Sequence, residues 1–105
     1  MTTATLVTLT ILVPAALEEE VEGIMIEHAP TAAAGFTVRD VRYHGDAAAY
    51  RSIVEQIRGY TQMIEVVVTL PQPDVTTLLG LIGETLPDRG ITFRTTPVGE
   101  VGRIG

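Results

Sequence analysis

Cysteine and lysine are both absent from this 105-residue sequence. Without cysteine, the chain can form no disulfide bond, no thiolate metal site and no cysteine nucleophile. All seven basic residues are arginine, against thirteen acidic residues, and the formal net charge is −6. Such an acidic chain repels a phosphate backbone, which argues against a nucleic-acid partner. The missing lysine fits either a biased genome or a need for the bidentate anion contacts that a guanidinium makes.

A long hydrophobic run is also missing. The apolar stretch over residues 2–13 falls well short of the roughly 20 residues that a membrane span requires. Neither a basic segment nor a clear cleavage site accompanies it, so we expect a strand here and a cytoplasmic protein. The length and the uninterrupted composition predict a single domain over residues 1–105. A hydrophobic content of 46% is enough for a core and for part of a subunit interface.

Hydrophobic periodicity and the positions of the prolines divide the chain into strands and helices. One helix is predicted between Pro14 and Pro30, and a second after Asp74, which is a suitable N-cap. Residues 44–60 form either a partly helical excursion or a mobile loop. Strands are predicted over residues 5–13, 35–43, 63–70 and 91–97.

The resulting order, βαββαβ, predicts an α+β protein with the ferredoxin-like fold. With right-handed crossovers, the four strands form one antiparallel sheet and both helices cover the same face. The other face of the sheet carries no helix, and an apolar open face usually binds a partner, so we expect an oligomer. The fold alone decides no function, because many unrelated functions share it.

Three segments resemble the PII signalling proteins, in matching order and spacing. Residues 14–19, PAALEE, are similar to the segment that opens the first PII helix, and residues 35–42, GFTVRDVR, are similar to its second strand. The third pairs IEVVV at residues 64–68 with PVGEVGRI at residues 97–104, which are similar to a PII strand and to the PII C-terminus. The loop glutamine with which PII binds magnesium and oxoglutarate has no counterpart at residues 43–47. The chain is therefore most similar to the divergent PII-like group, whose members accompany either bicarbonate uptake and carboxysomes or heavy-metal efflux pumps.

This resemblance implies a homotrimer that binds an adenine nucleotide, ADP, AMP or ATP, in the cleft between neighbouring subunits. Thr37 would lie near the adenine, the turn Asp88-Arg89-Gly90 would meet the phosphates, and Arg103 would contact phosphate through its guanidinium. Each residue also has an alternative interpretation without a ligand. Thr37 would then be a strand threonine that faces water, Asp88-Arg89-Gly90 would be a turn that only ends a helix, and Arg103 would be an ordinary surface arginine. The second arginine of the PII tail is replaced by glycine at position 105, which favours ADP or AMP over ATP.

The densest polar cluster lies within the excursion at residues 44–60. Its arginines and backbone amides could hold a small anion such as bicarbonate beside the nucleotide, and the loop would then order and change the surface shown to a partner. The alternative is a solvated helical turn with a surface pair between Glu55 and Arg58. The cluster consists of Arg51, Ser52, Glu55, Gln56, Arg58 and Gly59.

His28 and His44 are the only histidines, and they could form a metal site with Asp46 or Glu27, although no spacing resembles a known one. The sequence contains no nucleophile–base pair, no paired carboxylates and no Walker motif, so neither catalysis nor a redox cofactor is expected. The main hypothesis is a sensor that regulates a membrane transporter or another protein of inorganic-carbon use. The alternatives are a metal-binding accessory protein of an efflux system and a structural trimer without a ligand.

Overall fold

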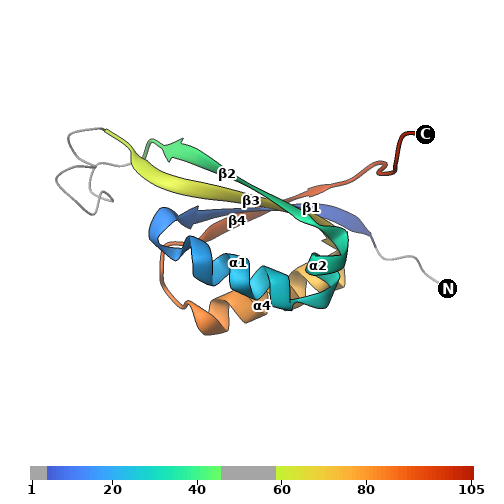
Figure 1. Ribbon diagram of the computed structural model, residues 1–105, viewed down its shortest axis with the longest axis horizontal. Coiled ribbons are helices and arrows are strands. Elements are labelled where there is room, and N and C mark those ends of the chain that lie inside the picture. Colours follow the sequence, from blue (N-terminus) through green and yellow to red (C-terminus); the bar gives the residue numbers. More distant parts are fainter. Residues whose placement is uncertain (1–4, 46–58) are drawn as a thin grey trace.

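A computed structural model describes residues 5–45 and 59–105, and its centre is a four-stranded sheet in the order β2-β3-β1-β4 (Figure 1). All three pairings between neighbouring strands are antiparallel. This is the predicted ferredoxin-like topology, and the predicted strand boundaries are within two residues of the observed ones. The strands are β1, Leu6–Pro14; β2, Phe36–Tyr43; β3, Thr61–Pro71; and β4, Thr92–Pro97.

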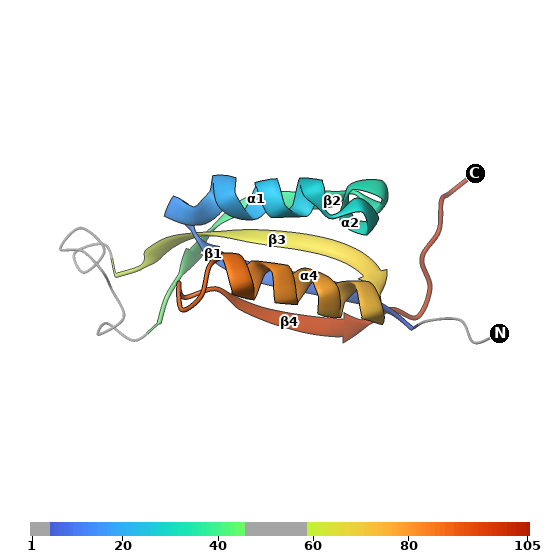
Figure 2. The same cartoon turned by 90° about the horizontal axis from the view of Figure 1, so that it is seen from below.

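The helices form one layer on one face of the sheet (Figure 2). The segment predicted as the first helix is divided in three and continues beyond Pro30. Pro30 is the second residue of α2, where its missing N–H group costs no intrahelical hydrogen bond. The three pieces are the 3-10 turn η1, Ala15–Leu17; α1, Glu18–Glu27; and α2, Ala29–Ala34.

The start of the last helix also differs from the prediction. Helix α4, Gln72–Thr85, has Pro71 at its N-cap and no side-chain capping bond, so the prediction that Asp74 caps the helix was wrong. Pro73, in the first turn, already has a φ that suits a helix, and the helix begins at Gln72, three residues earlier than an Asp74 cap would predict. Asp74 instead lies in the first turn, where its carboxylate suits the positive end of the helix dipole.

The core lies between the sheet and the helices. Alternate residues of β1 and β3 face the helices, and residues directly opposite each other in the two strands lie on the same side of the sheet. The edge strands β2 and β4 contribute less, and every residue of β4 is exposed. No described helix is long and apolar enough to cross a membrane. The main core residues are Val7, Leu9, Ile11, Val13, Leu17, Val21, Met25, Ile64, Val66, Val68, Leu70, Val75, Leu78, Ile82 and Leu86.

The helix-free face of the sheet carries many threonines. Thr8 and Thr69 lie opposite each other on β1 and β3, and their hydroxyl oxygens are 3.1 Å apart. Further along this face, Arg39 on β2 donates to Glu65 on β3, with an Nη2–Oε1 distance of 2.9 Å. The face is therefore more polar than an apolar oligomer interface would be.

Candidate functional site

Thr37 lies near the start of β2, with its side chain exposed on the helix-free face. It lines a hollow of about 610 Å³, which we call the β2 hollow. Gly35, with a φ of 79°, leads from α2 into this strand in a conformation that favours glycine. The hollow is lined by Leu6, Ala34, Gly35, Phe36, Thr37, Val67, Val68, Thr69 and Val101.

The C-terminal segment contributes to the same hollow. After β4, one further backbone bond from the Val98 N–H to the Leu6 carbonyl, at 3.2 Å, keeps the chain against β1. The tail over residues 99–105 is exposed and without regular structure, and Val101 lines the β2 hollow two residues before Arg103. The structure therefore brings Thr37 close to the segment that carries the predicted phosphate-binding arginine. Arg103 itself is exposed and has no ion-pair partner among the described residues.

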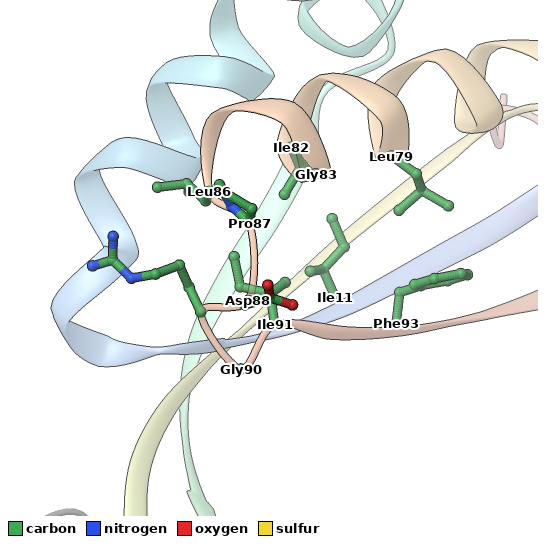
Figure 3. A pocket seen from close by; sticks show the side chains of 11 residues that line it. Ile11, Leu79, Ile82, Gly83, Leu86, Pro87, Asp88, Gly90, Ile91 and Phe93 are labelled. Atoms are coloured by element: carbon green, nitrogen blue, oxygen red, sulfur yellow. The ribbon is translucent and has the colours of Figure 1, made fainter.

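The turn Asp88-Arg89-Gly90 lies between α4 and β4, beside a second hollow of about 490 Å³ that we call the α4–β4 hollow (Figure 3). Asp88 and Gly90 have positive φ values of 53° and 78°, which aspartate tolerates and glycine favours. The exposed side chains of Asp88 and Arg89 are the charged groups that line this hollow. The lining residues are Ile11, Leu79, Ile82, Gly83, Leu86, Pro87, Asp88, Arg89, Gly90, Ile91 and Phe93.

One chain does not bring these two hollows together. Strands β2 and β4 form opposite edges of the sheet, about 14 Å apart at the usual spacing between strands. The register places Thr37 in the same row as Arg94, whereas the turn precedes Thr92 at the far end of β4. A ligand that contacts both Thr37 and the Asp88–Gly90 turn would therefore need residues from a second copy of the chain.

The base of the excursion carries a cluster that the sequence analysis did not identify. The Tyr60 ring lies 5.1 Å from the Arg42 guanidinium carbon and 5.8 Å, between ring centroids, from His44. This arrangement joins the end of β2 to the start of β3 through a cation–π contact. This cluster could have been predicted from the sequence, because Arg42 and His44 precede most of the excursion and Tyr60 ends it. Of the predicted anion site, only Gly59, with a φ of 76°, is described. Arg51, Ser52, Glu55, Gln56 and Arg58 lie outside the described residues.

The two histidines are not neighbours. His28, between α1 and α2, is buried, and its Nδ1 lies 2.7 Å from the Thr31 hydroxyl. His44 follows the far end of β2. Within residues 5–45 and 59–105, no three His, Cys, Asp or Glu side chains converge as a metal site would require. Acidic residues gather instead at the start of α1, where desolvation, and then the neighbouring Glu22, raise the pKa of Glu18 above its ordinary value of 4.5.

Comparison with known proteins identifies the family of the chain. The family model described as protein of unknown function, DUF3240, matches residues 3–105. No protein of curated function matches the sequence. A crystal structure of a DUF3240 family protein from Shewanella baltica OS155 superposes with a TM-score of 0.76 at 14% identity, covering 98% of this chain and 100% of that one.

Two PII-like proteins have the same fold. CPII, a nitrogen regulatory PII-like protein from Thiomonas intermedia K12 bound to ADP, AMP and bicarbonate, superposes with a TM-score of 0.69 at 17% identity, over 94% of both chains. A putative PII-like signaling protein from Thermus thermophilus gives a TM-score of 0.62 at 18% identity, over 93% of this chain and 91% of that one. At these identities the superpositions establish the fold alone. The chain therefore belongs to the DUF3240 family and shares its fold with PII-like proteins.

Proposed function

We propose that this protein is a non-enzymatic, cytoplasmic sensor that binds an adenine nucleotide, ADP, AMP or ATP, together with bicarbonate. In this proposal three copies assemble, and the ligands bind in the clefts between them. The observation that carries the proposal is the shared fold with CPII, whose structure contains ADP, AMP and bicarbonate. The bound state would regulate a membrane transporter or another protein of inorganic-carbon use.

The arrangement of the candidate residues supports a site between copies. Thr37 lies on the β2 edge of the sheet, close to Val101 of the tail, and the Asp88–Gly90 turn lies before the start of β4, on the opposite edge. In a closed assembly, the β2 edge of one copy can face the β4 edge of the next, which would bring a tail and a turn to one ligand. An acidic protein also needs a local positive charge to hold an anion, and the exposed Arg103 supplies one.

Each residue has a distinct role in this proposal. Arg103 bridges two phosphate oxygens, and the backbone N–H groups beside Gly90 approach the phosphates, because that glycine has no Cβ to keep them away. Thr37 exchanges a hydrogen bond with the adenine or the ribose through its hydroxyl. The bicarbonate would bind the cluster at the excursion: Arg51, Ser52, Glu55, Gln56, Arg58 and Gly59.

Calorimetric titration tests this function directly. The protein would be titrated with ADP, AMP and ATP, each with and without bicarbonate, while light scattering gives its mass. We expect Thr37→Val to weaken ADP binding about two- to tenfold, as the loss of one hydrogen bond predicts. Thr76→Val, at an exposed position on α4, is the control and should bind normally. A monomeric protein that binds none of these nucleotides would refute the proposal, and binding of copper, zinc or nickel instead would favour the efflux alternative.

A further inference from the structure

The break between α1 and α2 centres on one buried histidine. His28 ends α1 by donating its backbone N–H to the Ile24 carbonyl at 3.0 Å, and it is also the residue before α2. Its own carbonyl accepts the first backbone bond of α2, from the Ala32 N–H at 3.0 Å. The last bond of α2 runs from the Gly35 N–H to the Thr31 carbonyl at 2.9 Å. His28 and Thr31 therefore accept the backbone bonds at the two ends of the same short helix.

The side chains of these two residues also pair with each other. His28 is 8% exposed, Thr31 is fully buried, and Nδ1 of the ring lies 2.7 Å from the threonine hydroxyl oxygen. A hydroxyl both donates and accepts, so it can pair with either tautomer of the ring. A buried polar group without a partner is costly, so the loss of either side chain should leave the other in an unfavourable environment. The pair thus favours one arrangement of the α1–α2 break.

Helix α2 depends on such support. It has only six residues, and helices this short are marginal in water unless tertiary contacts hold them. No described side chain caps its first turn, and Pro30 has no N–H group to bond. The His28–Thr31 pair joins the residue before the helix to its third residue, and it supplies the connection that a cap would otherwise make.

Helix α2 also places one wall of the β2 hollow. Ala34 ends the helix, and residues 35–37 line the hollow together with it. Neither His28 nor Thr31 is among the described residues that line the hollow. These two residues can therefore affect a ligand there only through the position of α2 and of the start of β2.

We propose that His28 and Thr31 are positioning residues for the β2 hollow. Their buried hydrogen bond fixes the end of α2, and with it the placement of Gly35 and Thr37 in the wall of the hollow. Gly35 should respond first when the bond is weakened, because its N–H bonds directly to Thr31. This placement needs no ligand, whereas its effect on ADP rests on the proposed function.

Amide hydrogen exchange at Gly35 measures the placement without a ligand. Thr31→Val removes the hydroxyl at nearly constant size, and His28→Phe removes the ring nitrogens. Each should speed exchange of the Gly35 N–H about two- to tenfold, as the loss of one hydrogen bond predicts. The double variant should exchange no faster than the quicker single variant, because both changes remove the same bond. His28→Asn should restore protection, since its side-chain amide offers a polar atom at about the position of Nδ1.

Val75→Ala is the matched control. It removes buried apolar atoms from α4 and lowers the stability of the whole fold, but it does not touch the α1–α2 break. Exchange at Gly35 should stay nearly unchanged in this variant, well below its unfolding temperature. Equal acceleration in Val75→Ala and Thr31→Val would overturn the proposal, because protection would then follow global stability. So would unchanged exchange at Gly35 in both Thr31→Val and His28→Phe.

Calorimetry with ADP separates this inference from the proposed function. Where the wild-type protein binds ADP, Thr31→Val should weaken binding about two- to tenfold, and Val75→Ala should bind normally. A Thr31→Val chain that binds ADP as tightly as the wild type would also overturn the proposal. If the wild type binds no ADP, the proposed function fails, and the exchange at Gly35 alone decides whether the pair positions the hollow.

Discussion

The β2 hollow and the α4–β4 hollow lie at opposite edges of one sheet but are built differently. The buried core residues Ile11, Ile82 and Leu86 form one wall of the α4–β4 hollow, and the exposed 87–90 turn and Phe93 complete it. The β2 hollow is closed on one side by Val101 of an exposed tail. The core wall of the α4–β4 hollow should therefore persist as long as the fold does, whereas a change in the position of the tail would change the β2 hollow. Substitutions in the exposed tail should therefore alter the β2 hollow with little loss of stability.

The largest expected effect concerns the core wall of the α4–β4 hollow. Ile82→Ala removes a buried side chain and should lower the free energy of unfolding by about 2–5 kcal/mol. Leu81→Ala, at the next position and 39% exposed, should cost much less. Denaturant unfolding with a constant m-value measures both. Equal losses for the two variants would show that this hollow is not part of the core.

The second prediction concerns Arg103 in the C-terminal tail. Arg103→Ala should weaken ADP binding by about 1.5–3 kcal/mol, roughly ten- to a hundredfold, because a charge-assisted phosphate contact is lost. Arg103→Lys should restore only part of the affinity, since an ammonium cannot make the bidentate contact. The unfolding free energy should stay within about 0.5 kcal/mol.

Arg94→Ala, an exposed arginine on β4, is the control for this series, and calorimetry gives both affinities. If the two arginine variants bind ADP equally well, the predicted phosphate contact at the tail does not exist. A large loss of stability in Arg103→Ala would instead show that the tail is part of the rigid fold.

A smaller effect on stability is expected from an ion pair on the helix-free face of the sheet. Arg39 and Glu65 pair across β2 and β3, with side chains 71% and 14% exposed. A double-mutant cycle with Arg39→Ala and Glu65→Ala should give a coupling of about 0.2–1 kcal/mol that falls as salt is added. A coupling well above this range would indicate that another copy covers the face and excludes water.

The smallest effect concerns the acidic start of α1. The pKa of Glu18 is raised by desolvation and by Glu22, so the folded state holds a proton at pH values where the unfolded chain has lost it. Stability should therefore decrease as the pH rises from 4.5 through the raised pKa. Glu18→Gln should remove this part of the pH dependence, and Glu27→Gln at the exposed end of α1 should leave it unchanged. Identical pH profiles for wild type and Glu18→Gln would contradict the expectation.

The fold was largely predictable from the sequence, because strands with one buried face leave a strong pattern. The alternation of threonine with leucine, valine and isoleucine over residues 5–13 gave the position of β1, and with it the centre of the sheet. Helix α2 was missed because proline was interpreted as a stop signal, although it is equally compatible with a first turn.

The candidate sites were less predictable. Thr37 could be identified from its resemblance to PII, but neither hollow could be, because each depends on side chains that are distant in sequence. The α4–β4 hollow combines Ile11 with Phe93 and Gly83, and no local pattern contains all three. The ring contacts of Tyr60 with Arg42 and His44 likewise connect residues on opposite sides of the excursion.

The six-residue helix α2 has a consequence for how the length of this protein can vary. It ends at Ala34, and Gly35 leads directly into β2. One inserted residue would rotate the exit of the helix by about 100°. If β2 absorbed the insertion by slipping one position, every side chain of that strand would change faces, and Thr37 would turn from the helix-free face into the core side. The length of helix α2 therefore determines which side chains of β2 face the core. We expect insertions and deletions among relatives to fall outside this helix.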